Sequence, residues 1–279
     1  MSNSKKKMKK PVKILLIVLI VIAVLTPIQL YVLGSMGGIG PLGYLKAEKI
    51  AKLPGNAAEY DFSNITAMEN SPLAGEKLGI LGSSVARGTA SLECAVGEYL
   101  AARFDMSLTK EAVGSTTLCT DLENSYVERI KNIDPNEELD LLVVQLSTND
   151  AKRRSYDKGC ELGEIAEGTD LADFDTGTVT GAMEYIIVYA QQTWGCPVVF
   201  FTGSYYESEE YSAMVDRLLE LEEKYGIGVL DLYTNDAFNA ISEEDRALYM
   251  DDKIHPTKAG YRLWWGPEME AQLLTYLKK

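Results

Sequence analysis

The segment Leu139-Asp140-Leu141-Leu142-Val143-Val144-Gln145-Leu146 decides the fold class of this 279-residue chain. An apolar run of this length is typical of a strand buried on both faces, and such strands occur in parallel sheets covered by helices. Four further strands are predicted at 78–81, 107–113, 197–202 and 227–232. Helical patterns alternate with them at 91–104, 118–133, 181–193, 211–225 and 256–277. The alternation predicts an α/β fold with a five-stranded parallel sheet covered on both sides.

Small and polar residues follow several of these predicted strands. Ser84, Gly114, Asn149 and Ser204 each come after a strand, and His255 lies in the loop before the last predicted helix. Ligand sites of parallel sheets lie at the carboxyl ends of the strands. We therefore expect these residues at one edge of the sheet.

Charge is spread unevenly along the chain. The net charge is −14, yet the first thirteen residues contain six lysines and no acid. Without these six lysines the rest of the chain carries −20. An acidic body repels the phosphate backbone, so nucleic acid is not an expected partner.

The basic N-terminus precedes an almost wholly apolar run at 14–33. Twenty helical residues span about 30 Å, the thickness of the hydrocarbon core of a bilayer. We predict a cytoplasmic tail (1–13), a transmembrane signal anchor (14–33), a linker (34–75) and an extracytoplasmic domain (76–279). The alternative is a cleaved signal peptide with its break at Pro27, which leaves the domain secreted.

The four cysteines, Cys94, Cys119, Cys160 and Cys196, lie far apart and form no C-x-x-C pair. With a single histidine in the chain, this spacing does not predict a zinc site. In an exported protein the cysteines allow three full disulfide pairings, and the alternative is four buried thiols. The sequence does not choose between them.

The only histidine, His255, stands in the run Asp252-Lys253-Ile254-His255-Pro256. A serine hydroxyl needs an adjacent base to act as a nucleophile, and imidazole suits proton transfer near neutral pH. An acid three residues before the histidine can accept the ring Nδ1–H and leave Nε2 to face Ser84. The chain contains no G-x-S-x-G motif, which argues against an α/β-hydrolase elbow.

Four separated blocks within residues 76–279 resemble the SGNH/GDSL hydrolase family of esterases. The blocks are Gly82-Ser83-Ser84-x-x-x-Gly88, Ala112-Val113-Gly114-Ser115-Thr116, Ser147-Thr148-Asn149-Asp150 and Asp252-x-x-His255-Pro256. The resemblance implies a three-layer α/β/α sandwich of the flavodoxin-like type. It also implies a catalytic triad of Ser84, Asp252 and His255.

The resemblance implies an oxyanion hole as well, made by the Ser84 and Gly114 amides and the Asn149 side chain. Two positions depart from the family pattern. Ser83 replaces the aspartate before the nucleophile, and Ser147 replaces a glycine. A shift of one residue in the second block would move the donor amide from Gly114 to Ser115.

The function that these patterns predict is a membrane-tethered serine esterase that forms an acyl-Ser84 intermediate without a metal or organic cofactor. The resemblance implies carboxylic ester substrates, with O-acetyl or short acyl groups, including esters of polysaccharides. Tyr205 and Tyr206 follow the fourth strand and are candidates for stacking on a sugar. Two alternatives stay open, namely a surface O-acyltransferase with the same triad and a non-catalytic glycan-binding module.

Overall fold

The computed structural model describes residues 10–14, 17–19, 21–22, 25–27 and 40–278. The chain divides into two units, Met1–Lys52 and Leu53–Lys279. The first unit contains helix α2 (Gly40–Ala51). Within the described part of the chain, no helix is both long and apolar enough to cross a bilayer. The span expected at 14–33 falls partly outside the described residues and stays a prediction.

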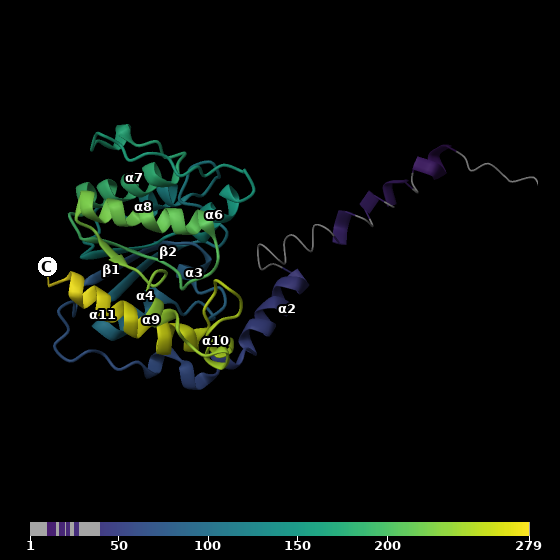
Figure 1. Ribbon diagram of the computed structural model, residues 1–279. Helices are drawn as coiled ribbons and strands as arrows, with labels where there is room; N and C mark the ends of the chain where they lie inside the picture. Colours follow the sequence, from purple (N-terminus) through teal and green to yellow (C-terminus); the bar gives the residue numbers. More distant parts are fainter. Residues whose placement is uncertain (1–9, 15–16, 20, 23–24, 28–39, 279) are drawn as a thin grey trace, which may run out of the picture. The chain divides into compact units, whose positions relative to one another are not determined.

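The second unit is built on a five-stranded sheet in which every pairing is parallel (Figure 1). The strand order is β2-β1-β3-β4-β5, the order of flavodoxin-like folds. All five predicted strands are confirmed, with ends that differ by a few residues. The strands are β1 (Lys77–Gly82), β2 (Ser107–Ala112), β3 (Leu141–Gln145), β4 (Val198–Phe201) and β5 (Gly228–Leu230).

The apolar residues of β3 alternate between two cores, because neighbouring side chains of a strand point to opposite faces of the sheet. Leu142 and Val144 belong to the core beneath α7 and α8, whereas Leu141 and Val143 belong to the core beneath α4 and α11. Figure 1 shows these helix pairs on opposite sides of the sheet. The predicted α/β fold with both faces covered is therefore confirmed. The helices are α4 (Val96–Phe104), α7 (Val179–Thr193), α8 (Glu209–Tyr225) and α11 (Gly266–Tyr276).

Shorter helical segments connect these elements. The α-helices are α3 (Ser84–Arg87), α5 (Tyr126–Arg129), α6 (Thr148–Arg154), α9 (Asp236–Asn239) and α10 (Glu243–Tyr249). The 3-10 turns are η1 (Pro54–Asn56), η2 (Ala58–Tyr60), η3 (Phe62–Asn64), η4 (Ile130–Asn132) and η5 (Leu171–Asp173). A π-helical segment, η6 (Gly260–Trp265), leads directly into α11.

Two helices expected from the sequence are shorter than predicted. The prediction of a helix at 118–133 was wrong over its first half. There the Leu118 and Cys119 amides donate to the Asp150 carboxylate instead of to helix carbonyls. Its helical part begins only at the Ser125 cap. The helix predicted at 91–104 begins at Val96, since residues 92 and 93 adopt positive φ angles of 56° and 66°.

Residues 53–75, part of the stretch expected to be a linker, belong to the same compact unit as the sheet. The Asn56 side chain donates to the Ala90 carbonyl at 2.8 Å and accepts from the Lys258 amide at 2.9 Å. The Phe62 ring contacts the Tyr99 ring edge-on, with centroids 6.3 Å apart. This segment therefore packs beside α4 and the start of the C-terminal helical region.

Candidate active site

Ser84 is the first residue of helix α3, directly after the β1–α3 turn. The turn is tight, because a Cβ atom built on Gly82 would lie only 2.3 Å from the Ala86 Cβ. Gly88, at a φ of 84°, ends α3 in the left-handed conformation that glycine adopts readily. Since Ser84 opens the helix, its N–H has no carbonyl acceptor within α3.

The structure brings Ser84, His255 and Asp252 together. The Ser84 Oγ lies 2.8 Å from the His255 Nε2. On the other side of the ring, the His255 Nδ1 lies 2.8 Å from the Asp252 Oδ2 and 3.0 Å from its Oδ1. Asp252 is half-exposed, with 53% of its side chain accessible, whereas the His255 side chain is 23% accessible. These distances form a continuous hydrogen-bond chain from hydroxyl to imidazole to carboxylate.

The loop that carries His255 is organised by Asp252 itself. The Asp252 Oδ1 accepts the backbone N–H of Ile254 at 2.7 Å and that of His255 at 2.8 Å. Burial alone would raise the pKa of Asp252, but the His255 side chain and these amides outweigh it and lower the pKa to about 2. The carboxylate is therefore ionised at neutral pH and accepts the ring Nδ1–H.

The other two predicted blocks also lie at this edge of the sheet. A Cβ atom built on Gly114 would be 3.9 Å from the Ser84 Cβ, so the Gly114 backbone passes close to the serine. Asn149 lies in the first turn of α6, where Ser147 caps the helix. The Asn149 Nδ2 donates to the Thr116 carbonyl at 2.8 Å. A side-chain amide nitrogen carries two N–H groups, so the second remains for a ligand.

Two buried residues that the sequence analysis did not single out hold this edge together. The Gln145 Oε1 accepts the amides of Ser83 (3.0 Å) and Ala86 (2.9 Å), and its Nε2 donates to the Ser83 hydroxyl (3.1 Å). Arg129 donates to the carbonyls of Gly82 and Glu111, both at 2.8 Å. A polar residue ending an apolar strand is a signal that could have pointed to Gln145. The sequence offers no comparable signal for Arg129.

Asp150, next to Asn149, is fully buried and has a structural place. Its two oxygens accept the backbone amides of Leu118 (2.9 Å) and Cys119 (3.2 Å). Burial raises the pKa of Asp150, against hydrogen bonds that favour its ionised form. Within the described residues, the side chains that could hold a metal are Cys119, Asp150 and Cys160, a buried group without triad members.

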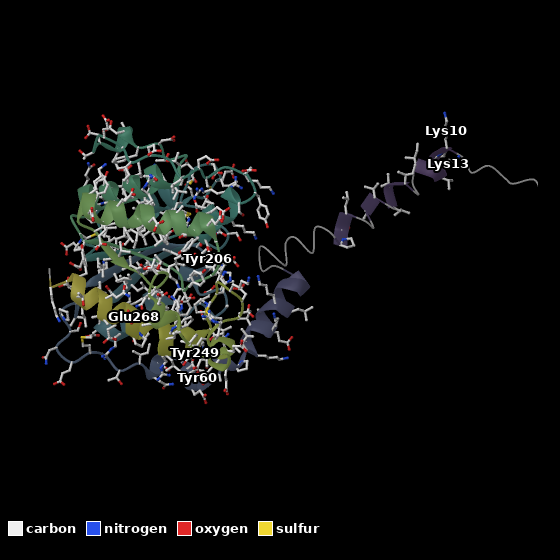
Figure 2. The ribbon with its side chains drawn as sticks, viewed as in Figure 1. Lys10, Lys13, Tyr60, Tyr206, Tyr249 and Glu268 are labelled. Carbon is white, nitrogen blue, oxygen red and sulfur yellow. The ribbon has the colours of Figure 1, made fainter. Side chains whose placement is uncertain are left out.

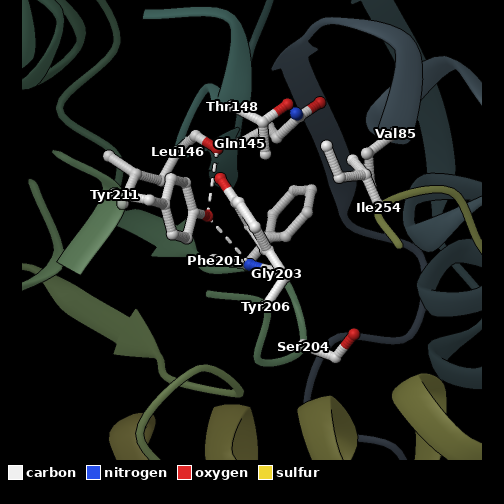
Figure 3. A pocket seen from close by; sticks show the side chains of 10 residues that line it. All are labelled: Val85, Gln145, Leu146, Thr148, Phe201, Gly203, Ser204, Tyr206, Tyr211 and Ile254. Atoms are coloured by element: carbon white, nitrogen blue, oxygen red, sulfur yellow. Dashed lines mark hydrogen bonds between the residues drawn. The ribbon is translucent and has the colours of Figure 1, made fainter. Parts of the chain in front are cut away.

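A small pocket of about 10 Å³ is lined by chain neighbours of the site residues (Figure 3). Its walls include Val85, Thr148 and Ile254, the chain neighbours of Ser84, Asn149 and His255, and residues at the carboxyl ends of β3 and β4. The Tyr211 hydroxyl closes one side, donating to the Leu146 carbonyl at 3.3 Å and accepting the Gly203 amide at 2.9 Å. The lining residues are Val85, Gln145, Leu146, Thr148, Phe201, Gly203, Ser204, Tyr206, Tyr211 and Ile254.

A larger open groove of about 590 Å³ begins at Asp252 and runs beside α10. Tyr205, with 53% of its surface exposed, and Tyr206 line one end; Figure 2 labels Tyr206. The Tyr205 ring is held against Tyr233, with centroids 5.3 Å apart, and its amide donates to Asn239. The charged residues of the groove are Glu207, Glu243, Arg246, Asp252 and Lys253.

Comparisons with known proteins agree with this architecture. A Lactobacillus plantarum protein of solved structure superposes with a TM-score of 0.58 at 19% identity, over 72% of this chain and 98% of that one. A putative GDSL-like lipase from Bacteroides ovatus gives 0.52 at 15% identity, over 74% and 99%. An acetyl xylan esterase from Butyrivibrio proteoclasticus gives 0.50 at 12% identity, over 75% and 67%.

Among curated proteins no sequence matches this chain. The model of the GDSL-like Lipase/Acylhydrolase family matches residues 80–263, a region that contains all four blocks. The chain is thus an SGNH-type ester hydrolase and belongs to the GDSL-like Lipase/Acylhydrolase family.

Proposed function

We propose that the protein is a serine esterase in which Ser84 attacks the ester carbonyl and His255 acts as general base. The observation that carries the proposal is the chain of two 2.8 Å contacts from Ser84 through His255 to Asp252. The Ser84 Oγ forms a bond to the carbonyl carbon while its proton passes to Nε2. The same proton then goes to the departing alcohol, and water hydrolyses acyl-Ser84 by the reverse sequence. Asp252 keeps the imidazole in the tautomer that accepts at Nε2.

The carbonyl oxygen becomes negatively charged when the tetrahedral intermediate forms. The Ser84 N–H, the Gly114 N–H and the second N–H of Asn149 are the donors proposed to stabilise it. The contact of Gly114 with Ser84 and the anchoring of Asn149 on Thr116 support this assignment. Loss of one such donor costs about 3–4 kcal/mol of transition-state stabilisation in comparable sites.

The proposed acyl group is short, with acetyl as the best fit. The small pocket lined by Val85, the chain neighbour of Ser84, offers only about 10 Å³, close to the space that one water molecule needs. Tyr206 limits it further, because its ring packs against Tyr211 and Tyr233 at centroid distances of 5.1 and 6.0 Å. A long acyl chain would require these rings to move.

The proposed alcohol is a carbohydrate bound in the open groove. An exposed aromatic face next to charged donors and acceptors is suited to a sugar ring. Tyr205 is held against Tyr233 and lines the same groove as Asp252. The acetyl xylan esterase among the structural neighbours is consistent with this class of substrate. We place the enzyme outside the cytoplasm, tethered by residues 14–33, on the evidence of the lysine-rich N-terminus and its apolar run.

The proposal is tested with a fluorophosphonate probe and with acyl esters of increasing chain length. Wild-type protein should be labelled at Ser84, and acetyl esters should be hydrolysed faster than hexanoyl esters. Ser84→Ala should abolish labelling and hydrolysis without loss of the fold, since the side chain is only partly buried. Ser83→Ala is the matched control and should retain substantial activity, because its hydroxyl contacts Gln145 and not His255.

Two outcomes would contradict this function. Labelling of Ser83 instead of Ser84 would mean that the first block is shifted by one residue. A folded protein that neither reacts with the probe nor hydrolyses any ester, but binds acetylated glycans, would be a non-catalytic binding module. Product analysis with an added acceptor sugar separates hydrolysis from acyl transfer, because transfer leaves the acyl group on the acceptor.

A further inference from the structure

Two cysteines meet in the interior next to the loop that leads from the second block. Cys119 follows β2 on the segment that bears Gly114 and Thr116, and Cys160 follows α6, the helix of Asn149. Their side chains are 0% and 1% exposed, and their sulfur atoms lie within 4.8 Å of each other. Cys160 holds a φ of 60°, in the left-handed region that favours glycine.

The other two cysteines are placed where they cannot join this pair. Cys94 packs against the core beneath α4 and α11, on the opposite face of the sheet from Cys119. Cys196 shares the core of Cys119 but precedes β4, at the amino end of the strands. Of the pairings that four cysteines allow, the structure therefore leaves only Cys119 with Cys160.

We propose that Cys119 and Cys160 form a disulfide bond when the chain meets a disulfide oxidant, such as oxidised glutathione. One sulfur attacks the oxidant and forms a mixed disulfide, and the second sulfur displaces the oxidant's remaining thiol. The two cysteines lose two protons and two electrons, and the oxidant becomes two thiols. The bond requires the sulfurs to approach to about 2.05 Å, from a separation of no more than 4.8 Å.

The surroundings of the two sulfurs tolerate a neutral disulfide. Contact with Cys160, burial and the nearby Asp150 raise the pKa of the Cys119 thiol, so the thiolate is unfavourable here. Oxidation removes the Cys160 thiol that donates to Asp121 at 3.2 Å, but Asp121 keeps the Arg153 guanidinium at 2.7 Å. Asp150 keeps its two backbone amides. No carboxylate is left without a partner.

The same three side chains are less suited to a metal ion. Structural zinc takes four ligands, and the group in the described part of the chain offers three. Both oxygens of Asp150 already accept backbone amides, which leaves the carboxylate poorly placed to bind an ion. Disulfide formation uses only the two sulfurs and leaves Asp150 in place.

The cross-link would fasten the segment of Thr116 to the segment that follows the Asn149 helix. It closes the stretch from 119 to 160, which contains α5, β3 and α6. A loop of this length restricts the unfolded chain strongly, so the oxidised protein should melt on the order of 10 °C higher than the reduced protein. The cross-link would restrain the two segments that hold Asn149 in place, and it would not involve Ser84 or His255.

The test equilibrates the full-length protein with mixtures of oxidised and reduced glutathione. The protein is then denatured, alkylated and digested for mass spectrometry. Under oxidising mixtures we expect alkylation of Cys94 and Cys196 only, together with one peptide in which Cys119 is joined to Cys160. Excess reductant should give four alkylated cysteines and the lower melting temperature. Because this measurement uses the wild-type protein, its outcome does not depend on whether a variant folds.

Matched variants separate this pair from the others. Cys119→Ser should leave Cys160 open to alkylation and make the melting temperature independent of the glutathione ratio. Cys196→Ser should keep the cross-linked peptide and its redox-dependent melting. Four alkylated cysteines at the most oxidising ratio would overturn the proposal, as would a cross-link that includes Cys94 or Cys196. Thiols that become reactive only after treatment with a chelator would show a metal site instead.

Discussion

At the scale of single residues, Asn149 is the donor whose role can be isolated most cleanly. Its backbone is fixed by the Ser147 cap and its side chain by the Thr116 carbonyl. Asn149→Ala should lower kcat about a hundredfold or more with little change in KM, because the amide would bind charge that exists only in the transition state. Steady-state kinetics on an acetyl ester provide the measurement.

Asn149→Ser is a useful companion variant, since it keeps a short polar side chain but shortens the reach of the donor. A rise in KM alone, with kcat preserved, would mean that Asn149 positions the substrate and does not stabilise the oxyanion. Circular dichroism of both variants checks that the overall fold is kept.

Asp252 should make stability depend on pH in acid. Its pKa of about 2 in the folded protein lies below its ordinary value of 3.8, so the folded state favours the carboxylate. The stabilisation is present above pH 4 and is lost as pH falls from about 4 through about 2. Solvent screening keeps the effect small, because the side chain is half-exposed. Thermal melts of wild type and Asp252→Asn should converge as pH falls through this range, and a constant difference would contradict the assignment.

At the scale of elements, the turn between β1 and α3 depends on the end of a different strand. Gln145 closes β3 and supplies the acceptor for two amides of that turn, Ser83 and Ala86. Gln145→Leu should leave both amides buried without a partner, at a cost of about 1–3 kcal/mol each in stability. The variant should also lower kcat, since the turn sets the position of Ser84.

Gln145→Glu supplies the control for this prediction. Its carboxylate can still accept the two amides, so kcat should recover relative to the leucine variant, although burial of a charge lowers stability. Melting temperature and kcat, measured for both variants, separate the loss of stability from the loss of turn geometry. Equal kcat in wild type and Gln145→Leu would show that the turn keeps its geometry without the side chain.

The elements differ in how far the sequence predicts them. The five strands follow from apolar runs, because residues buried on both faces leave a pattern that depends only on their own neighbours. The first half of the helix expected at 118–133 does not form, because its amides pair with Asp150, about thirty residues away. The same reason explains why the supporting roles of Gln145 and Arg129 escape prediction. Their partners lie on other elements of the fold, so even the polar end of β3, which marks Gln145, does not reveal what that side chain binds.

At the scale of the whole molecule, topology gathers the site. The strand order places β1 between β2 and β3, so the chain reverses its direction of winding at β1. Ligand sites of such sheets lie at this point, outside the carboxyl ends of the strands. Ser84, Gly114 and Asn149 follow these three strands in turn. The sequence motifs predicted that Ser84, His255 and Asp252 lie in contact. The groove and the small pocket depend on ring packing that the sequence does not reveal.

The distribution of charge along the whole chain leads to a prediction about its orientation in a membrane. Six lysines precede the apolar run at 14–33, and the remaining chain is strongly acidic. Lysines flanking such a run stay on the cytoplasmic side, so residues 35–279 should be exported. Protease added to intact cells should digest the acidic domain.

The mature N-terminus separates an anchor from a cleaved signal peptide. Mass analysis of the mature protein should find the lysines at 5–10 still attached, because an uncleaved anchor retains them. A mature chain that begins near residue 35 would contradict the anchor and preserve export, since Pro27 would then mark the end of a signal core. A domain that resists protease in intact cells and is digested only after lysis would contradict both. Export would also expose Cys119 and Cys160 to the oxidants that their proposed disulfide requires.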